Sequence, residues 1–411
     1  MTYSLLSGVR IVESSAFIAA PLCGLTLAQY GADVIRFDMI GGGIDYRRLP
    51  IAPAGRSVYW TSLNKAKRSI AIDARRPEGR ELLQALVTAP GSGGGILLSN
   101  IPAGFLAHDT LATMRPDLIS CLIEGNFDGS TAVDYTVNCA TGYPMITGHG
   151  SPDRPVNQAL PAWDVACAYQ AAFGLMLAIH RRSVTGQGQA LRLALSDVAF
   201  GVLSHLGLLT EASLAMPPRQ AIGNDIYGAF GRDFATVDGR RVMVAAISSR
   251  QWQALVEACA IGPAVAALEG ALRVDFASEA VRFDYREVIA ALVKPWIAGR
   301  SLGEVAETFD RLSVCWGSFQ SVAELVAMDR RASELNPLFT RIDTPGVGMH
   351  LAAGATIRLA DVERADTEPA PLLGQHTDDI LGDVLGLADG QIGRLHDAGI
   401  VAGPARDLLN S

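Results

Sequence analysis

Short, mostly apolar segments alternate with helical patterns along the first part of the chain. Each such segment has five or six residues, which suits a buried strand, and the segments are 9–13, 33–37, 69–73, 95–99 and 118–123. Pro21 and Pro77 stand where the intervening helices would begin, a position that favours proline because its missing N–H would have no partner there. The alternation predicts right-handed β-α-β units around a mostly parallel sheet, with ligands bound past the carboxyl ends of the strands.

A different pattern begins near residue 225. The segment 234–245 alternates in hydrophobicity around Asp238-Gly239, a pair typical of a tight hairpin turn. Helical patterns follow from Trp252 to about Ala327, and a stretch rich in Pro and Gly occupies 337–354. We therefore predict a large α/β domain at 1–215, a smaller α+β domain at 225–330 and a C-terminal segment at 345–411 that returns to the large domain.

The composition is that of a globular protein with a large core, because hydrophobic residues are 49% of the 411 residues and charged residues only 18%. The net charge of −8, with no run of Lys or Arg, argues against a nucleic-acid partner. The six cysteines show no C-x-x-C spacing, so neither a zinc site nor a disulfide framework is indicated.

Two segments bear on targeting. The first eight residues lack the basic region and apolar stretch of a signal peptide. The most apolar segment, 165–179, is shorter than the ~20 residues that a membrane span needs, and Asp164 and His180 flank it. We therefore expect a buried helix at 165–179 and a cytoplasmic protein with no membrane partner.

Nucleotide-binding and hydrolase motifs are missing from the sequence. Residues 14–21 follow the first predicted strand and read Ser-Ser-Ala-Phe-Ile-Ala-Ala-Pro in place of G-x-G-x-x-G. A P-loop, G-x-S-x-G and H-E-x-x-H are also absent. An α/β oxidoreductase is therefore not indicated, and we expect no bound metal.

Asp164 is the most informative carboxylate, because it directly precedes the apolar segment 165–179. Aspartate is a favoured helix N-cap, worth about 1 kcal/mol, and capping alone would account for its position. A carboxylate at a helix N-terminus is also kept ionised by the helix dipole, as a nucleophile requires. The structural and the catalytic interpretation are compatible.

Basic and glycine-rich segments are weaker signals. The cluster Asn64-Lys-Ala-Lys-Arg-Ser, together with Arg36, could neutralise phosphates, although a solvated loop explains it equally well. The glycine-rich segments 41–43 and 227–231 could be plain turns or could present backbone N–H groups to an oxyanion.

In order and spacing, several motifs resemble the family III CoA-transferases, the group that includes the carnitine, bile-acid and formyl-CoA transferases. The resemblance covers nearly the whole chain. Its motifs are Leu6-Ser-Gly-Val-Arg-Ile-Val-Glu, Gly31-Ala-Asp-Val-Ile-Arg, Lys67-Arg-Ser-Ile, Pro77-Glu-Gly-Arg, Thr185-Gly-Gln-Gly-Gln, Leu373-Gly-Gln-His-Thr-Asp and Val384-Leu-Gly-Leu. It implies a Rossmann-like large domain, a smaller α+β domain and an interlocked homodimer in which each chain threads through the other.

The resemblance also implies roles for single residues. Asp164 falls on the position of the nucleophilic aspartate. Arg36, Lys67 and Asn100 fall where the family contacts CoA, and Asp134 falls where an acidic residue lies beside the active site. No cofactor is expected beyond the CoA that the substrate carries.

Other positions bear on the substrate. Tyr227, Gly228 and Gly231 belong to a segment that resembles the loop covering the acyl intermediate. Ile18 stands where formyl-CoA transferases use a glutamine, so formate and oxalate are not expected substrates. Val133 stands where racemases of this fold need a histidine, which argues against racemase chemistry.

Four segments resemble a subgroup that moves CoA between the two carboxyl groups of one mesaconate molecule, and they are 11–21, 41–47, 133–138 and 227–234. The resemblance implies conversion of 2-methylfumaryl-CoA to 3-methylfumaryl-CoA, in CO2 fixation by the 3-hydroxypropionate cycle. Asp164 would attack the C1 thioester, forming a mixed anhydride and then an aspartyl-CoA thioester before CoA returns to C4. The free carboxylate of the diacid needs a cation, for which Arg47 and Arg232 are candidates.

Three alternatives stay open at this point. An intermolecular CoA-transferase that acts on another dicarboxylic acyl-CoA would use the same Asp164, and similarity of fold does not separate the two reactions. A racemase is disfavoured by Val133. A non-catalytic CoA-binding protein is disfavoured by an aspartate at the nucleophile position.

Overall fold

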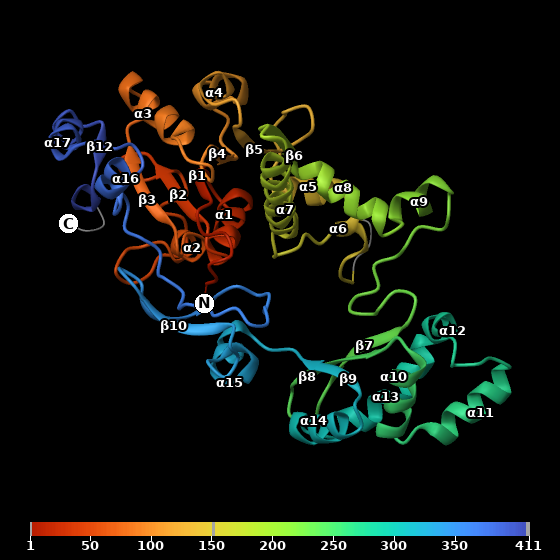
Figure 1. Cartoon of the computed structure of the whole chain (residues 1–411). Helices are drawn as coiled ribbons and strands as arrows, with labels where there is room; N and C mark the ends of the chain where they lie inside the picture. The colour runs from red at the N-terminus through yellow and green to blue at the C-terminus, as the bar shows by residue number, and fades with distance from the viewer. Residues whose placement is uncertain (1, 150–152, 408–411) are drawn as a thin grey trace. The chain divides into compact units, whose positions relative to one another are not determined.

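The computed structural model describes residues 2–149 and 153–407. The chain divides into two compact units (Figure 1). Unit 1 consists of Met1–Thr141, Gln158–Met216 and Arg330–Ser411, and unit 2 consists of Gly142–Asn157 and Pro217–Asp329. Each unit has its own cluster of buried hydrophobic side chains.

Unit 1 is built, within its described residues, on a seven-stranded sheet with the order β12-β3-β2-β1-β4-β5-β6. Every neighbouring pair is parallel except β12 and β3, which confirms the predicted mostly parallel sheet. The strands are β1 (Arg10–Ser14), β2 (Asp33–Asp38), β3 (Arg68–Ile72), β4 (Ile96–Ser99), β5 (Ile119–Glu124), β6 (Gln189–Ala194) and β12 (Val401–Ala402). The strand order reverses between β1 and β4, where doubly wound sheets open a crevice for ligands.

Helices cover both faces of this sheet. One face carries α1 (Ala19–Gln29) and α7 (Ala162–Thr185), which pack against each other, and α3 (Pro77–Thr88) lies with α4 (His108–Met114) on the other (Figure 1). The remaining elements of unit 1 are α2 (Val58–Leu63), α5 (Asp134–Ala140), α8 (Leu195–His205), α9 (Leu208–Ser213), α16 (Thr377–Asp383), α17 (Asp389–Asp397), the hairpin strands β10 (Phe339–Thr344) and β11 (Gly348–Ala353), and the 3₁₀ turns η1 (Gly104–Leu106), η2 (Arg330–Ala332) and η3 (Pro404–Arg406).

Helix α7 is longer than the segment 165–179 suggested, and it ends at Gly186 with a left-handed φ of 71°. The helix is long enough and apolar enough to cross a membrane, but buried core helices often have the same length and composition. It packs against α1, α8, β5 and β6, which accounts for its buried residues. A stripe of apolar side chains on it is nevertheless exposed, and it consists of Tyr169, Phe173, Leu177 and Val184.

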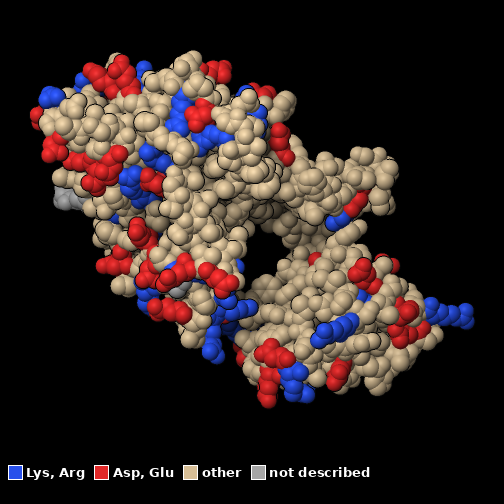
Figure 2. Space-filling view, viewed as in Figure 1, with Lys and Arg blue, Asp and Glu red and all other residues tan. Residues whose placement is uncertain are grey.

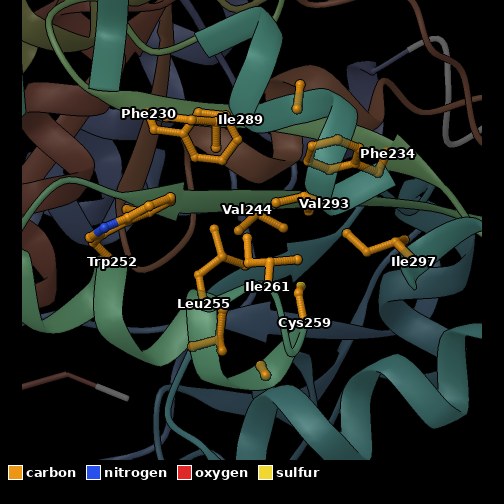
Figure 3. Close-up of a cluster of buried hydrophobic side chains, with 14 of the residues drawn as sticks. Phe230, Phe234, Val244, Trp252, Leu255, Cys259, Ile261, Ile289, Val293 and Ile297 are labelled. Carbon is orange, nitrogen blue, oxygen red and sulfur yellow. The ribbon is translucent and has the colours of Figure 1, made fainter. Parts of the chain in front are cut away.

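Unit 2 contains an antiparallel sheet with the order β7-β8-β9, and helices supply the other side of its core (Figure 3). Aromatic and branched side chains of β7 and β8 meet those of α10 and α13, with Phe230 and Trp252 in edge contact. Its elements are α6 (Tyr143–Ile146), β7 (Phe230–Ala235), β8 (Arg241–Ala246), α10 (Ser249–Ala258), α11 (Gly262–Leu272), α12 (Glu279–Asp284), α13 (Arg286–Ala298), α14 (Leu302–Arg311), β9 (Cys315–Ser318) and α15 (Val322–Met328).

The structure also corrects the expected elements. The predicted hairpin turn is present, with Gly239 at a φ of 75°, but β9 interrupts the segment expected to be helical. The stretch 337–354 forms the β10–β11 hairpin.

On the face shown in Figure 2, acidic and basic side chains are interspersed, with broad uncharged areas between them.

Candidate active site

A cavity of about 550 Å³ lies in unit 1 at the carboxyl ends of β1, β4, β5 and the end of β6. It therefore occupies the side of the sheet where ligands were expected, next to the point at which the strand order reverses. Its lining residues are Phe17, Ile18, Ala19, Arg48, Tyr59, Asn100, Ile123, Glu124, Gly125, Ala132, Val133, Asp134, Tyr135, Pro161, Asp164 and Leu195. Four of the residues singled out in the sequence, Ile18, Asn100, Asp134 and Asp164, thus share one cavity.

The first turn of α7 presents Asp164 to this cavity. The N-cap position belongs to Pro161, so the expectation that Asp164 caps the helix is wrong. Asp134, at the start of α5, does this instead: its Oδ2 accepts hydrogen bonds from the backbone N–H groups of Trp163 (2.7 Å) and Asp164 (3.1 Å). Asp134 therefore holds the end of the helix that carries the candidate nucleophile.

Burial, and not the helix dipole, dominates the ionisation of Asp164. Removal from water raises the pKa of Asp164 to about 7, and the nearby charge of Asp134 acts in the same direction. Burial likewise raises the pKa of Asp134, against the effect of its two backbone hydrogen bonds. No described residue donates a hydrogen bond to the Asp164 carboxylate, so its oxygens remain available to a ligand in the cavity.

The wall beside Asp164 is a fixed loop that follows β1. Asn100, at the end of β4, accepts a hydrogen bond from the N–H of Ala16 (2.9 Å) and donates one to its carbonyl (2.8 Å). The N–H of Phe17 donates to Asp45 (2.9 Å), and Phe17 has a φ of 63°, which is unusual for a residue with a bulky side chain. The Asn100 side chain thus joins the two strands at the switch point and positions the loop.

Arg36 and Lys67, predicted to contact CoA, lie in a buried ionic cluster behind this loop. All five N–H groups of Arg36 have partners, and the acceptors are Glu13, Ser15, Asp38 and Asp45. Lys67 donates to Glu13, Asn64 and the carbonyl of Pro21, each at 2.9 Å. Both side chains are 0% exposed, so neither has a donor left for a phosphate in this arrangement.

The charges of this cluster are strongly coupled. Burial lowers the pKa of Lys67 to about 8, against the attraction of Glu13. Burial would also lower the pKa of Arg36, but Asp38, Glu13 and Asp45 outweigh it and raise that pKa. The cluster is therefore held together by its cations, and it fixes Asp45 under the loop that lines the cavity.

Sequence reasoning missed Arg48, which lines the cavity. Both Arg47, the predicted candidate, and Arg48 are exposed, but of the described residues Arg48 alone brings a positive charge to the cavity lining. Its guanidinium carbon lies 5.3 Å from the ring centre of Phe17 and 5.2 Å from that of Tyr59. These aromatic contacts come from distant parts of the chain, so the sequence carried no signal that separates Arg48 from Arg47.

Tyr59, on α2, brings a hydroxyl group to the same cavity. Burial raises its pKa to about 12, with Asp164 and Asp45 contributing and Arg48 opposing. The phenol is therefore protonated at neutral pH and can donate a hydrogen bond to an oxyanion.

The other predicted residues belong to unit 2. The Tyr227 ring is half exposed, with the Arg219 guanidinium 4.0 Å from its centre, and Gly228 has a left-handed φ of 78°. Gly231 lies in β7, where a Cβ would come within 2.2 Å of Ile226. A covering role for the segment 227–231 stays a prediction.

Arg232, the other predicted candidate for the free carboxylate, is already paired within unit 2. It binds the carboxylates of Asp225 and Glu287, each at 2.5 Å, and their hydrogen bonds raise its pKa. These partners neutralise its charge, which argues against the predicted role. No group of three or more His, Cys, Asp or Glu suited to a metal occurs among the described residues.

Comparison with known proteins decides the family. A family model described as CoA-transferase family III matches residues 6–377. The chain belongs to this family. It is 47% identical over 404 residues to 2-methylfumaryl-CoA isomerase from Chloroflexus aurantiacus, which covers 98% of this chain and 99% of that protein.

More distant family III members agree with this assignment. Formyl-CoA:oxalate CoA-transferase from Rhodopseudomonas palustris (strain HaA2) is 27% identical, over 98% of both chains. A solved CAIB/BAIF family protein from Brucella suis has a TM-score of 0.73 at 25% identity, covering 93% of this chain and all of that one. The predicted family, its fold and the narrower resemblance are therefore confirmed.

Proposed function

We propose that this family III CoA-transferase moves CoA between the two carboxyl groups of one mesaconate molecule, which converts 2-methylfumaryl-CoA to 3-methylfumaryl-CoA. The observation that carries this proposal is an unbonded carboxylate, Asp164, in the same cavity as an unpaired cation, Arg48. A nucleophile and a carboxylate-binding group together suit an acyl-CoA with a second, free carboxylate. The identity to 2-methylfumaryl-CoA isomerase supports the choice of acid.

The proposed chemistry begins with attack of the Asp164 carboxylate on the C1 thioester carbonyl, which breaks the C–S bond and releases CoA thiolate. The thiolate then attacks the aspartyl carbonyl of the mixed anhydride, giving an aspartyl-CoA thioester and free mesaconate. The C4 carboxylate next attacks that thioester, and the thiolate released returns to C4 of the second anhydride. Asp164 ends as a free carboxylate, so no cofactor is consumed.

The surrounding residues support this chemistry in different ways. Tyr59 lines the cavity with a protonated phenol, which would donate to the oxyanion of a tetrahedral intermediate. Asn100 and the Arg36–Asp45 pair would act by holding the loop at Phe17, and we therefore assign Arg36 and Lys67 a positioning role in place of direct CoA contact. Asp134 would raise the pKa of Asp164 and orient α7.

A homodimer is part of the proposal. The exposed stripe of Tyr169, Phe173, Leu177 and Val184 runs along one face of α7, and a second copy of the chain is the occupant that we propose. An interlocked arrangement and a place in CO2 fixation by the 3-hydroxypropionate cycle are proposed as the family resemblance implied, and a cytoplasmic location is proposed as the sequence indicated.

The test is to incubate the purified protein with 2-methylfumaryl-CoA and excess isotope-labelled free mesaconate, and to follow isomers and label by mass-detected chromatography. We expect unlabelled 3-methylfumaryl-CoA. Label in the CoA ester would favour the intermolecular alternative, and no reaction would overturn the substrate assignment.

Asp164→Ala provides the matched control for the nucleophile. It should reduce turnover by about 1,000-fold or more, because the other carboxylates of the cavity lining, Asp134 and Glu124, are bonded to the α7 backbone and to Arg192. Its melting temperature should stay close to wild type, since Asp134 and not Asp164 caps α7. Near-wild-type turnover would contradict the covalent mechanism.

A further inference from the structure

We infer that Arg48 is the subsite for the free carboxylate of the diacid, and that it retains mesaconate in the cavity while CoA is bound to Asp164. This inference rests on the proposed function and deepens it. A reaction that stays within one molecule needs the detached acid to remain bound between its two halves. A group that binds a carboxylate independently of CoA is therefore required.

The cavity supplies one cation for this task. Arg48 and Asp164 both line it, and no other Lys or Arg of the described residues does. Arg36, behind the loop at Phe17, is by contrast paired with Glu13, Asp38 and Asp45. No described residue accepts a hydrogen bond from the guanidinium of Arg48 or forms an ion pair with it.

The contacts that Arg48 does make leave its donors available. Phe17 and Tyr59 are both within stacking range of the guanidinium, at 5.3 and 5.2 Å from its central carbon. Stacking uses the faces of a guanidinium, whereas its N–H groups lie in the plane and point outward. An arginine held by aromatic rings therefore keeps the edge that binds a carboxylate bidentately.

The position of this arginine is fixed from several sides. Its N–H donates to the carbonyl of Asp45 (3.0 Å), and its carbonyl accepts from the hydroxyl of Ser57 (2.5 Å). Ser57 is the N-cap of α2, the helix that carries Tyr59. The carboxylate of Asp45 also accepts from the N–H of Phe17, so one buried residue aligns the backbone of the arginine, through its carbonyl, and that of one flanking ring, through its side chain.

The order of events follows from charge. While CoA forms a thioester with Asp164, free mesaconate carries two negative charges and has lost its covalent link to the enzyme-bound CoA. Arg48 would hold one carboxylate while the other attacks the aspartyl thioester. Before that attack, the C4 carboxylate must leave Arg48 and the C1 carboxylate must replace it, which is a rotation of the diacid at this subsite.

Arg48→Gln tests the inference, with Arg47→Gln as the matched control on the exposed neighbouring residue. We expect Arg48→Gln to lower kcat/KM for isomerisation about 100-fold, the cost of removing a charged partner from a carboxylate. Label from free mesaconate should enter its CoA ester several-fold more often per turnover than in wild type. Arg47→Gln should match wild type in both measurements.

Further outcomes separate this inference from the proposed function. Arg48→Lys keeps the charge and should restore part of the isomerisation rate and of the retention of mesaconate. Thermal melting of each variant would reveal a folding defect. If wild type isomerises and Arg48→Gln retains mesaconate as Arg47→Gln does, the assignment of Arg48 is overturned while the function stands. An inactive wild type would overturn the proposed function and this inference with it.

Discussion

At the scale of single residues, the environment of Asp164 outweighs its place in a helix. A helix N-terminus favours an ionised carboxylate by about 0.3–1 kcal/mol at an exposed site. Burial and the like charge of Asp134 act against ionisation, and the result is a pKa of about 7. A group that titrates near neutral pH makes the proposed reaction sensitive to pH.

The rate of isomerisation should depend on pH through Asp164. The nucleophile is the carboxylate, so kcat/KM should rise as pH increases through about 7 and then level off. Asp134→Asn removes the like charge but keeps an oxygen that can cap α7, so the rise should move to lower pH. The pH profile of kcat/KM for both proteins measures this, and an unchanged midpoint would contradict the role of Asp134.

Residue types alone were a poor guide to which cation serves the substrate. Arg36, Lys67, Arg47 and Arg232 all looked suitable, because a sequence shows charge but not the partners that neutralise it. Buried carboxylates occupy the donors of Arg36 and Lys67, and Asp225 and Glu287 occupy those of Arg232. Only the fold distinguishes these residues from an arginine beside an open cavity.

At the scale of elements, α1 approaches β1 closely because it has a glycine at the point of contact. A Cβ at Gly24 would lie 1.7 Å from Oε2 of Glu13, the carboxylate that binds both Arg36 and Lys67. The glycine therefore allows the helix to cover the buried ionic cluster. Without that approach the cluster would be open to water at its helix side.

Gly24→Ala should lower stability by about 1–3 kcal/mol, because the added methyl group displaces a carboxylate with two buried cationic partners. Gly201→Ala, in α8, is the control, since no atom lies within 4 Å of the position of its Cβ. This control should gain up to about 1 kcal/mol from helix propensity. Urea unfolding measures both, and a shift of the same sign in the two variants would contradict the packing argument.

Elements bounded by clear start and stop residues were predictable from the sequence. Five of the parallel strands and the hairpin at Gly239 appear where alternation, proline and glycine indicated them. Strand β6 was missed because it is a half-exposed sheet edge, and β9 because four residues carry too little pattern. The β10–β11 hairpin was hidden by its Pro345-Gly346 turn, which suggested an irregular segment.

At the scale of the whole molecule, α7 carries both the candidate nucleophile and the surface that we propose for dimerisation. Its N-terminal turn carries Asp164, and its exposed stripe carries Tyr169, Phe173 and Leu177 at every fourth residue. The two features share one helix, so docking of a second copy would brace the element that holds the nucleophile.

Phe173→Glu should weaken the proposed dimer, because Phe173 is 61% exposed in the single chain and a charge there would be buried by a partner. We expect light scattering after gel filtration to report a dimer for wild type and a larger monomer fraction for the variant. Met114→Glu, on α4 and 52% exposed, is the control and should remain dimeric. A monomeric wild type would contradict the dimer itself.

The sequence by itself determined the doubly wound architecture, the family and the aspartate that we assign as nucleophile, because these depend on local periodicity and on motifs in fixed order. Tertiary structure decided which charges are buried in pairs and which one faces the cavity. It also decided that Asp134, 30 residues before Asp164 in the chain, caps the helix that carries it. Burial, the neutralisation of one charge by another and the capping of one element by a distant residue depend on groups brought together only by folding.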